Sequence, residues 1–174
     1  VLGAFWRFNL LRRVRSAHTD PIDQTIRYPP RGGRSRYTFS LFAFAEENFA
    51  RILTEFVAFA KDYYKNKGYR SNLLYVGYWI SRDQQALLSY SWDGNVMTID
   101  PVSTANKGWK EFLVEYNRFC MERDGKPLFN QTFGLTKEIA TKAFGARLQT
   151  MIDTCREHDP DGRLMNPYFK GLLT

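Results

Sequence analysis

The sequence has little of what builds metal sites and disulfide frameworks. It contains two cysteines and two histidines in 174 residues, and no Cys/His spacing resembles a zinc site. Two cysteines are too few for a disulfide framework, and Cys120 and Cys155 both fall in apolar stripes of predicted helices. We therefore expect buried, reduced thiols and no metal. A Ser/His/Asp catalytic arrangement is not expected either, because His18 and His158 are isolated and lie near predicted loops.

Long hydrophobic runs and glycine-rich loops are missing too. No apolar stretch approaches the roughly 20 residues that a membrane-spanning helix needs, and residues 1–7 do not read as a secretory signal. We expect a cytoplasmic protein, and the start at Val1 favours a fragment or a processed chain. The glycine pair Gly32–Gly33 does not make a dinucleotide-binding fingerprint. What the chain does have is 44% hydrophobic and 16% aromatic residues, which predicts a folded domain with a substantial core.

Positive charge is gathered at one end of the sequence. Residues 1–37 hold eight arginines against two aspartates, whereas the net charge of the whole chain is +7. We predict a basic leader and irregular linker over residues 1–35, with a short helix within residues 1–16, and a folded domain over residues 36–174. Such a leader could face nucleic acid, anionic lipid or an acidic surface of another domain.

Hydrophobic periodicity predicts the elements of the folded domain. Alternating patterns predict strands at Arg36–Phe44, Asn72–Ser81, Ala86–Ser91, Asn95–Pro101 and Lys126–Asn130. Helical spacing predicts helices from Glu46 to Gly68 and at Lys107–Arg123, Lys137–Phe144 and Ala146–Glu157. Asp93–Gly94 suits a tight hairpin turn between the third and fourth strands. The segment after the turn at Asp159–Gly162 is too short and too aromatic for an amphipathic helix, so we predict a docking tail.

This order of elements predicts an α+β fold. An antiparallel sheet of about five strands would carry two long helices on one face, with further helices at the C-terminus. The second predicted strand is apolar or aromatic on both faces. A sheet covered by helices on one side only does not need that pattern, so we expect its second face to meet a partner or a ligand.

Three segments resemble a known family. They are Gly125–Asn130, Leu135–Thr136 and the closing Asp159–Tyr168. Together they look like the C-terminal part of FAD-dependent oxidases of the vanillyl-alcohol oxidase type, nearest the sugar-lactone and alditol oxidase branch, over roughly residues 36–173. The resemblance implies a ferredoxin-like cap domain that binds the substrate, while FAD is held mainly by a domain outside this chain. The implied reaction is oxidation of a hydroxyl-bearing carbon by hydride transfer to flavin, with oxygen or another electron acceptor, and the cap alone would be inactive.

The chain departs from the pattern of that branch at two places. His-Trp-Gly-Lys follows the Arg-Pro of the fifth strand in the branch, whereas Leu128–Gln131 follows Lys126–Pro127 here, so Gln131 stands near the position of the branch's lysine. The Glu-x-Arg of the second strand corresponds to Gly77 and Trp79. These changes favour a wider, more apolar pocket, and hence a larger, partly aromatic or lipid-like alcohol or a glycoside rather than a free polyol.

Candidate site residues follow from these positions. We predict Asn130 and Gln131 as catalytic residues that hydrogen-bond the substrate hydroxyl or the flavin, Tyr75, Trp79, Ser89 and Ser91 as substrate-binding residues, and Asn166 and Tyr168 as cofactor-binding residues. Each has a structural alternative: a turn that satisfies its own backbone, strand pairing, core packing, or packing of a terminus. Thr98 and Asp100 share one strand face and could be polar pocket groups, although Asp100 before Pro101 could also begin a turn.

A second class of function stays open at this point. A sheet with exposed aromatics and a basic arm is also typical of a nucleic-acid-binding module. The alternating aromatics of residues 36–44 fit that pattern, but the usual glycines are missing and the body is close to neutral, so nucleic acid is not the partner that we expect. A membrane-surface contact through residues 1–16 is compatible with the oxidase interpretation.

Overall fold

The computed structural model describes residues 38–173. The chain divides into two units between Arg34 and Ser35, and every described residue belongs to the second. The predictions for the N-terminal leader, namely the helix in residues 1–16, its membrane contact and the irregular linker, lie outside the described residues.

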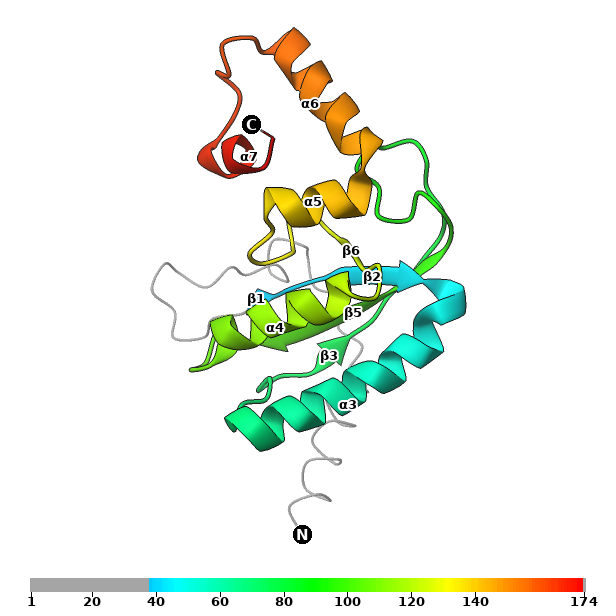
Figure 1. The fold of residues 1–174 in the computed structure, drawn as a ribbon, viewed down its shortest axis with the longest axis vertical. Coiled ribbons are helices and arrows are strands. Elements are labelled where there is room, and N and C mark those ends of the chain that lie inside the picture. The colour runs from blue at the N-terminus through cyan, green and yellow to red at the C-terminus, as the bar shows by residue number, and fades with distance from the viewer. Residues whose placement is uncertain (1–37, 174) are drawn as a thin grey trace, which may run out of the picture. The chain divides into compact units, whose positions relative to one another are not determined.

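The described part has a mixed α+β architecture, as predicted (Figure 1). Its strands are β1 (Thr38–Phe39), β2 (Phe42–Ala45), β3 (Tyr75–Val76), β4 (Trp79–Ile80), β5 (Val96–Ser103) and β6 (Lys126–Pro127). Its helices are the 3-10 turn η1 (Glu46–Asn48), α3 (Phe49–Lys67), α4 (Trp109–Met121), α5 (Lys137–Phe144), α6 (Ala146–His158) and α7 (Pro167–Leu173).

Strand β5 is the centre of an antiparallel sheet. It pairs with β1 and β2 along one edge and with β3 and β4 along the other, and β6 pairs with β2. Met97 shows the arrangement, since it lies opposite Phe44 of β2 and also opposite Trp79 of β4. The eight residues of β5 therefore pair with four short strands, two on each edge.

Two predicted strands are interrupted where they pass β5. The first is broken at Ser40–Leu41, beside Pro101, which has no backbone N–H to donate to the ladder. The second is broken at Gly77–Tyr78, where the Thr98 hydroxyl replaces a backbone acceptor and takes the Tyr78 N–H at 3.0 Å. Leu41 and Tyr78, one at each interruption, line the cavity described below.

Helices α3 and α4 cover one face of the sheet, as predicted (Figure 1). The core between them is largely aromatic: Phe42 and Phe44 of β2 pack against Phe56 of α3 and Phe112 and Tyr116 of α4. The Tyr116 hydroxyl donates to the Ile99 carbonyl of β5 and so ties α4 to the central strand. Cys120 is buried in this core and Cys155 is half-buried on α6, and both thiols are free, as expected.

Helices α5, α6 and α7 form a second cluster with a core of its own. Its buried residues are Phe129, Leu135, Ala140, Ala143, Phe144, Leu148, Ile152, Leu172 and Leu173. Ile139 packs against both cores, and the Thr136 side chain caps α5 by accepting the Ile139 N–H. The two clusters therefore meet at the start of α5.

Three sequence predictions are wrong. Residues 86–91 form a turn and not a strand, since Ser89 N–H donates to Ala86 O at 2.9 Å, and β5 is already paired on both edges. The predicted hairpin turn at Asp93–Gly94 is also wrong, because residues 86–91 do not supply its first strand. The C-terminal tail is helical in α7, where Pro167 occupies a favourable first position and the Asn166 side chain accepts the Phe169 N–H at 2.9 Å.

Candidate functional site

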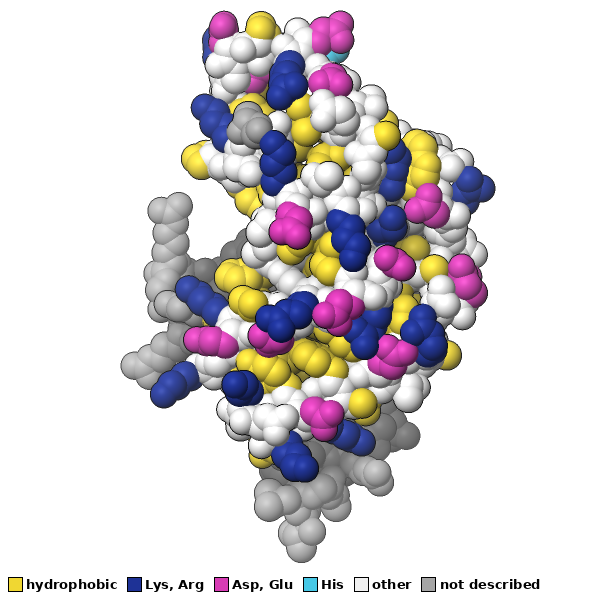
Figure 2. Space-filling model, in the orientation of Figure 1, with side chains coloured by type: hydrophobic (Ala, Val, Ile, Leu, Met, Phe, Trp, Pro, Cys, Tyr) yellow, Lys and Arg dark blue, Asp and Glu magenta, His cyan; other side chains and the backbone are white. Residues whose placement is uncertain are grey.

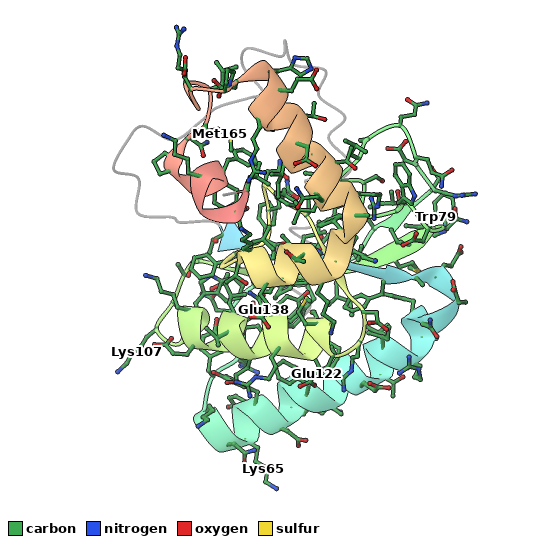
Figure 3. The ribbon with its side chains drawn as sticks, turned by 45° about the horizontal axis from the view of Figure 1, so that its top comes forward. Lys65, Trp79, Lys107, Glu122, Glu138 and Met165 are labelled. Carbon is green, nitrogen blue, oxygen red and sulfur yellow. The ribbon has the colours of Figure 1, made fainter. Side chains whose placement is uncertain are left out.

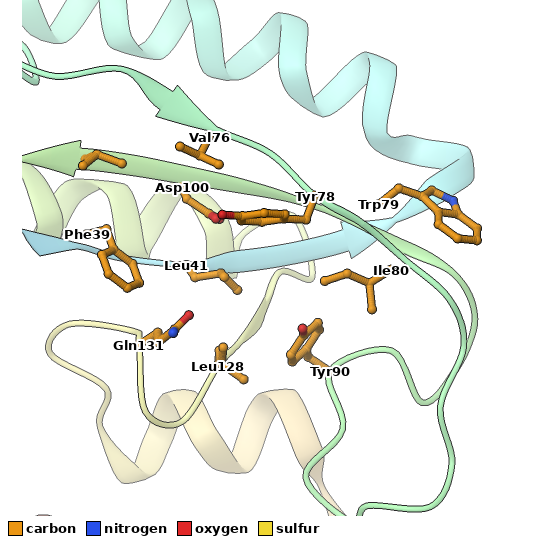
Figure 4. Close-up of a pocket in the computed structure, with 11 residues that line it drawn as sticks. Phe39, Leu41, Val76, Tyr78, Trp79, Ile80, Tyr90, Asp100, Leu128 and Gln131 are labelled. Atoms are coloured by element: carbon orange, nitrogen blue, oxygen red, sulfur yellow. The ribbon is translucent and has the colours of Figure 1, made fainter. Parts of the chain in front are cut away.

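A cavity of about 400 Å³ lies on the sheet face that α3 and α4 leave uncovered (Figure 4). Alternation along β5 puts Asp100 and Val102 at this face, while Ile99 points into the core beneath α4. The residues that line the cavity are Phe39, Leu41, Val76, Tyr78, Trp79, Ile80, Tyr90, Asp100, Val102, Leu128 and Gln131. The sheet face that was expected to meet a partner or a ligand therefore carries this cavity, and the occupant itself stays a prediction.

Asp100 is the one acidic residue among the described residues that line the cavity. It is 3% exposed, and its Oδ1 atom has no hydrogen-bond partner in the described part of the chain. Burial raises the pKa of Asp100 to about 7, and a hydrogen bond from the Thr98 side chain only partly opposes that shift. A carboxyl group with this pKa exchanges its proton near neutral pH, which is the property that a general base needs.

Aromatic and aliphatic side chains make up most of the remaining wall. In Figure 4 the Tyr78 ring extends along the sheet toward Asp100, and Tyr90 approaches from the loop below. Burial raises the pKa of the Tyr90 hydroxyl, and the charge of Asp100 adds to the shift. No Lys, Arg or His lines the cavity among residues 38–173. The site therefore suits a neutral, partly apolar molecule better than an anion.

Gln131 supplies the second polar side chain that approaches the cavity (Figure 4). It lies in a turn whose backbone is satisfied internally: the N–H groups of Gln131 and Thr132 donate to Leu128 O at 3.0 and 2.9 Å. The Thr132 hydroxyl in turn accepts the Leu128 N–H at 2.9 Å. Asn130, in the same turn, is exposed and does not line the cavity. Of the two predicted catalytic residues, the structure brings only Gln131 to the site.

Arg147 of α6 fixes the loop that carries Tyr90. Its Nη1 atom donates to the carbonyl oxygens of Leu87 and Ser89 at 2.7 and 3.0 Å. Its guanidinium group lies 4.8 Å from the centre of the Trp92 ring, within cation–π range. The wall at Tyr90 is therefore held by a helix from the second cluster.

The predicted substrate-binding residues are spread over several places. Trp79 lies at the rim of the cavity and at the sheet edge (Figure 3), with its Nε1–H donating to Glu46 Oε1 at 3.0 Å. Tyr75 packs its ring on Phe56, 5.2 Å between centroids, and is not part of the cavity lining. Ser89 and Ser91 approach each other, with 3.2 Å between their hydroxyl oxygens; they flank Tyr90 in the sequence but do not line the cavity.

The predicted cofactor-binding residues lie in the second cluster, away from the cavity lining. Asn166 caps α7, as described above, and Tyr168 donates its hydroxyl to Phe129 O. Figure 3 shows Met165, just before them, in the segment between α6 and α7. Local packing accounts for both side chains, and their role in cofactor binding stays a prediction.

Two residues that line the cavity, Tyr78 and Tyr90, were not singled out from the sequence, whereas Asp100 was named with Thr98 as a possible polar pocket group. Tyr78 belonged to a strand with two apolar faces, which gave no reason to prefer one face. Asp100 carried a signal, because an acidic residue between Ile99 and Pro101 in an otherwise apolar strand needs an explanation. Tyr90 had no signal, since its position depends on a loop anchored by Arg147, 57 positions further along the chain.

The described residues do not form a dinucleotide-binding or metal site of their own. No group of three or more His, Cys, Asp or Glu side chains among them could hold a metal ion. Single glycines precede α4 and α6, and neither helix of the described part begins with the glycine-rich loop that cradles a pyrophosphate. The cavity offers a carboxyl group, an amide and flat rings to a small molecule or to the edge of a ring system.

Comparison of the chain with models of known protein families and with curated proteins gave no match.

Proposed function

We propose that this chain is the substrate-binding half of an FAD-linked oxidoreductase that acts on a hydroxyl-bearing carbon. The observation that carries the proposal is Asp100, a carboxyl group buried in a largely apolar cavity on the open face of the sheet. Burial without a full set of partners is costly, and such groups are concentrated at functional sites. The resemblance of Gly125–Asn130 and Asp159–Tyr168 to flavin oxidases is the reason for proposing alcohol oxidation as the reaction class.

Each lining residue has a role in the proposed site. Ionised Asp100 accepts the proton of the substrate hydroxyl, and the Gln131 amide hydrogen-bonds the same oxygen and orients it. Tyr78 and Tyr90 enclose the apolar part of the substrate and exclude water, which strengthens these polar contacts. The wall of Leu41, Val76 and similar side chains makes a neutral apolar or aromatic alcohol a better ligand than a polyol.

FAD fits the chain only in a divided arrangement. The described residues lack a loop for its phosphates, so Asp100 and Gln131 would face the substrate and the flavin ring while another domain binds the dinucleotide. A bound flavin supplies the acceptor for the hydride that leaves the substrate carbon. This chain supplies the proton acceptor and the shape of the pocket.

The test uses the full-length protein with its flavin and a panel of xylitol, benzyl alcohol and 1-octanol. Loss of the flavin's visible absorbance on anaerobic mixing reports substrate oxidation. We expect reduction by an apolar alcohol, and a fall of about 10²–10⁴-fold in its rate for Asp100→Asn, as for removal of a general base. Asp153→Asn, which removes an exposed carboxylate from α6, is the matched control and should keep the wild-type rate.

The pH dependence gives a second measure of the same role. Because Asp100 must be ionised to accept a proton, kcat/KM of the wild type should fall as the pH drops below about 7. Asp100→Asn should lose that dependence. A colourless full-length protein, or a wild-type reduction rate in Asp100→Asn, would overturn the proposal.

The nucleic-acid alternative finds less support in the fold. Among the aromatic residues that gave residues 36–44 their alternating pattern, Phe42 and Phe44 are at most 1% exposed in the core beneath the helices and cannot stack on bases, while Phe39 lines the cavity. On the face shown in Figure 2, Lys and Arg side chains alternate with Asp and Glu side chains and form no continuous basic stripe. None of the described helices is long and apolar enough to cross a membrane.

A further inference from the structure

The connection between β4 and β5 is unusually long for an antiparallel pair. It runs from Ser81 to Asn95 without a helix or strand, whereas such connections are ordinarily 2–5 residues long, and longer irregular loops are usually functional. Its two ends are joined through the Asn95 side chain, whose Oδ1 accepts the backbone N–H of Arg82 at 3.0 Å. Its middle places Tyr90 in the cavity wall.

The 81–95 loop makes few backbone hydrogen bonds to the sheet, and side chains from outside the loop hold it in place. Within it, Asp83 N–H donates to Ser91 O at 3.2 Å, and Leu88 packs against the core of the second cluster. Arg147 donates two hydrogen bonds from a charged group, to Leu87 O and Ser89 O. The other charged contacts of the loop are the hydrogen bond from Arg82 Nε to Trp92 O at 3.2 Å and the Lys126–Asp93 ion pair at 3.5 Å. The carbonyl groups of Leu87 and Ser89 bracket the stretch that leads into Tyr90.

The position of Arg147 in its helix supports a role in holding the loop. Arg147 is the second residue of α6, where the positive end of the helix dipole disfavours a cation. Its guanidinium group is also partly withdrawn from water, and burial lowers the pKa of Arg147. Two carbonyl oxygens and the faces of Trp92 and Phe144, at 4.8 and 5.4 Å, offset these costs.

We propose that Arg147 is a positioning residue that holds the 81–95 loop in place, so that Tyr90 forms a fixed wall of the substrate cavity. The part of this inference that concerns substrate rests on the proposed function. Arg147 does not line the cavity, so it acts through the loop and does not take part in the chemistry. Without Arg147, the cavity would stay present but open on the side of Tyr90, and small alcohols would be held less tightly.

The first arm of the test needs no substrate. Hydrogen–deuterium exchange of the full-length protein is compared for the wild type, Arg147→Ala, Arg147→Lys and the matched control Arg156→Ala, whose side chain is exposed on the same helix. We expect exchange in residues 86–92 to rise at least about 10-fold in Arg147→Ala, since one hydrogen bond from a charged donor accounts for that factor. Exchange in α4 should be unchanged.

Arg147→Lys is the conservative variant that keeps the test decisive if Arg147→Ala fails to fold. Lysine keeps the charge but lacks the planar group that contacts Trp92 and reaches two carbonyl oxygens, so we expect the same local rise at smaller amplitude. Wild-type protection of the loop in both variants would overturn the proposal. An equal rise in the loop and in α4 would also overturn it, because that result assigns Arg147 a purely global role in stability.

The second arm uses benzyl alcohol as the probe with the flavin-loaded protein. For Arg147→Ala we expect KM to rise about 10-fold while kcat changes less than about twofold, as for loss of an interaction that binds substrate and transition state alike. An unchanged KM beside a mobile loop would overturn the link between Arg147 and the cavity. If even the wild type neither binds nor oxidises benzyl alcohol, the proposed function fails on this probe, while the exchange arm still decides whether Arg147 positions the loop.

Discussion

Replacing Asp100 by Asn should change how the stability of this domain depends on pH. The folded protein raises the pKa of Asp100 to about 7 from an ordinary value of 3.8. Between these two values the folded state keeps a proton that the unfolded chain has lost, so the free energy of unfolding decreases as pH rises. Below about pH 4 both states hold the proton and the cost vanishes, and above about pH 7 the cost is constant.

The size of the effect follows from the same two values. Each pKa unit corresponds to 1.36 kcal/mol, so an acid shifted by about three units costs the folded state about 4 kcal/mol at pH 8. At pH 5 the cost is only about 1–2 kcal/mol. The difference in unfolding free energy between Asp100→Asn and wild type should therefore grow by about 2–3 kcal/mol from pH 5 to pH 8, in favour of the variant. Its absolute value also includes any hydrogen bonds that the new amide lacks, whereas the change with pH does not.

Hydrogen exchange of the α4 amides in the full-length protein measures this quantity. Those amides lie in the core opposite the cavity and report the opening of the whole domain. Asp153→Asn is again the control for removal of an exposed carboxylate. A difference between Asp100→Asn and wild type that stays constant from pH 5 to pH 8 would refute the reasoning, because it would mean that Asp100 titrates alike in both states.

Two further predictions concern the frame around the site. Gly125→Ala should destabilise the protein by about 1–3 kcal/mol, because a Cβ atom there would lie 2.8 Å from Cys120 O and 3.0 Å from the Phe44 ring. Gly94→Ala is the control, since a Cβ atom there meets nothing within 4 Å. Thermal denaturation compares the two variants, and equal melting temperatures would contradict the prediction. Thr136→Ala removes the cap of α5 and should cost about 1 kcal/mol in the same assay, with Thr150→Ala, an exposed hydroxyl on α6 bonded to Ala146 O, as the variant expected to change little.

Helices were the most predictable part of the fold. The bounds of α5 are those predicted, and α3 ends at Lys67, just before Gly68, whose positive φ of 67° explains why glycine stands there. These boundaries depend on local signals such as caps and periodicity. The helical tail was missed because its N-cap, Asn166, follows a turn signal that reads as the end of regular structure.

Strands and the site were less predictable because they depend on distant residues. Residues 86–91 have the composition of a strand but no vacant edge of β5 to pair with. Trp79 and Gln131, which the resemblance suggested as site residues, line the cavity, and their roles stay predictions. Tyr90 lines the cavity from a loop whose carbonyl groups are bonded by the distant Arg147. No pattern within the loop itself encodes that contact.

The central position of β5 has a consequence for the order in which the domain can fold. Strands β1 to β4 and α3 are all synthesised before Val96, yet each of those strands pairs with β5. Until β5 leaves the ribosome, the aromatic residues of β2 and α3 have no sheet to pack on, and such exposed segments are prone to aggregate. The pairings are also distant in sequence, with Thr38 opposite Ser103, which slows folding. A nascent chain that stalls just before Val96 should therefore be a strong client of chaperones, whereas one that stalls after α4 should already be compact.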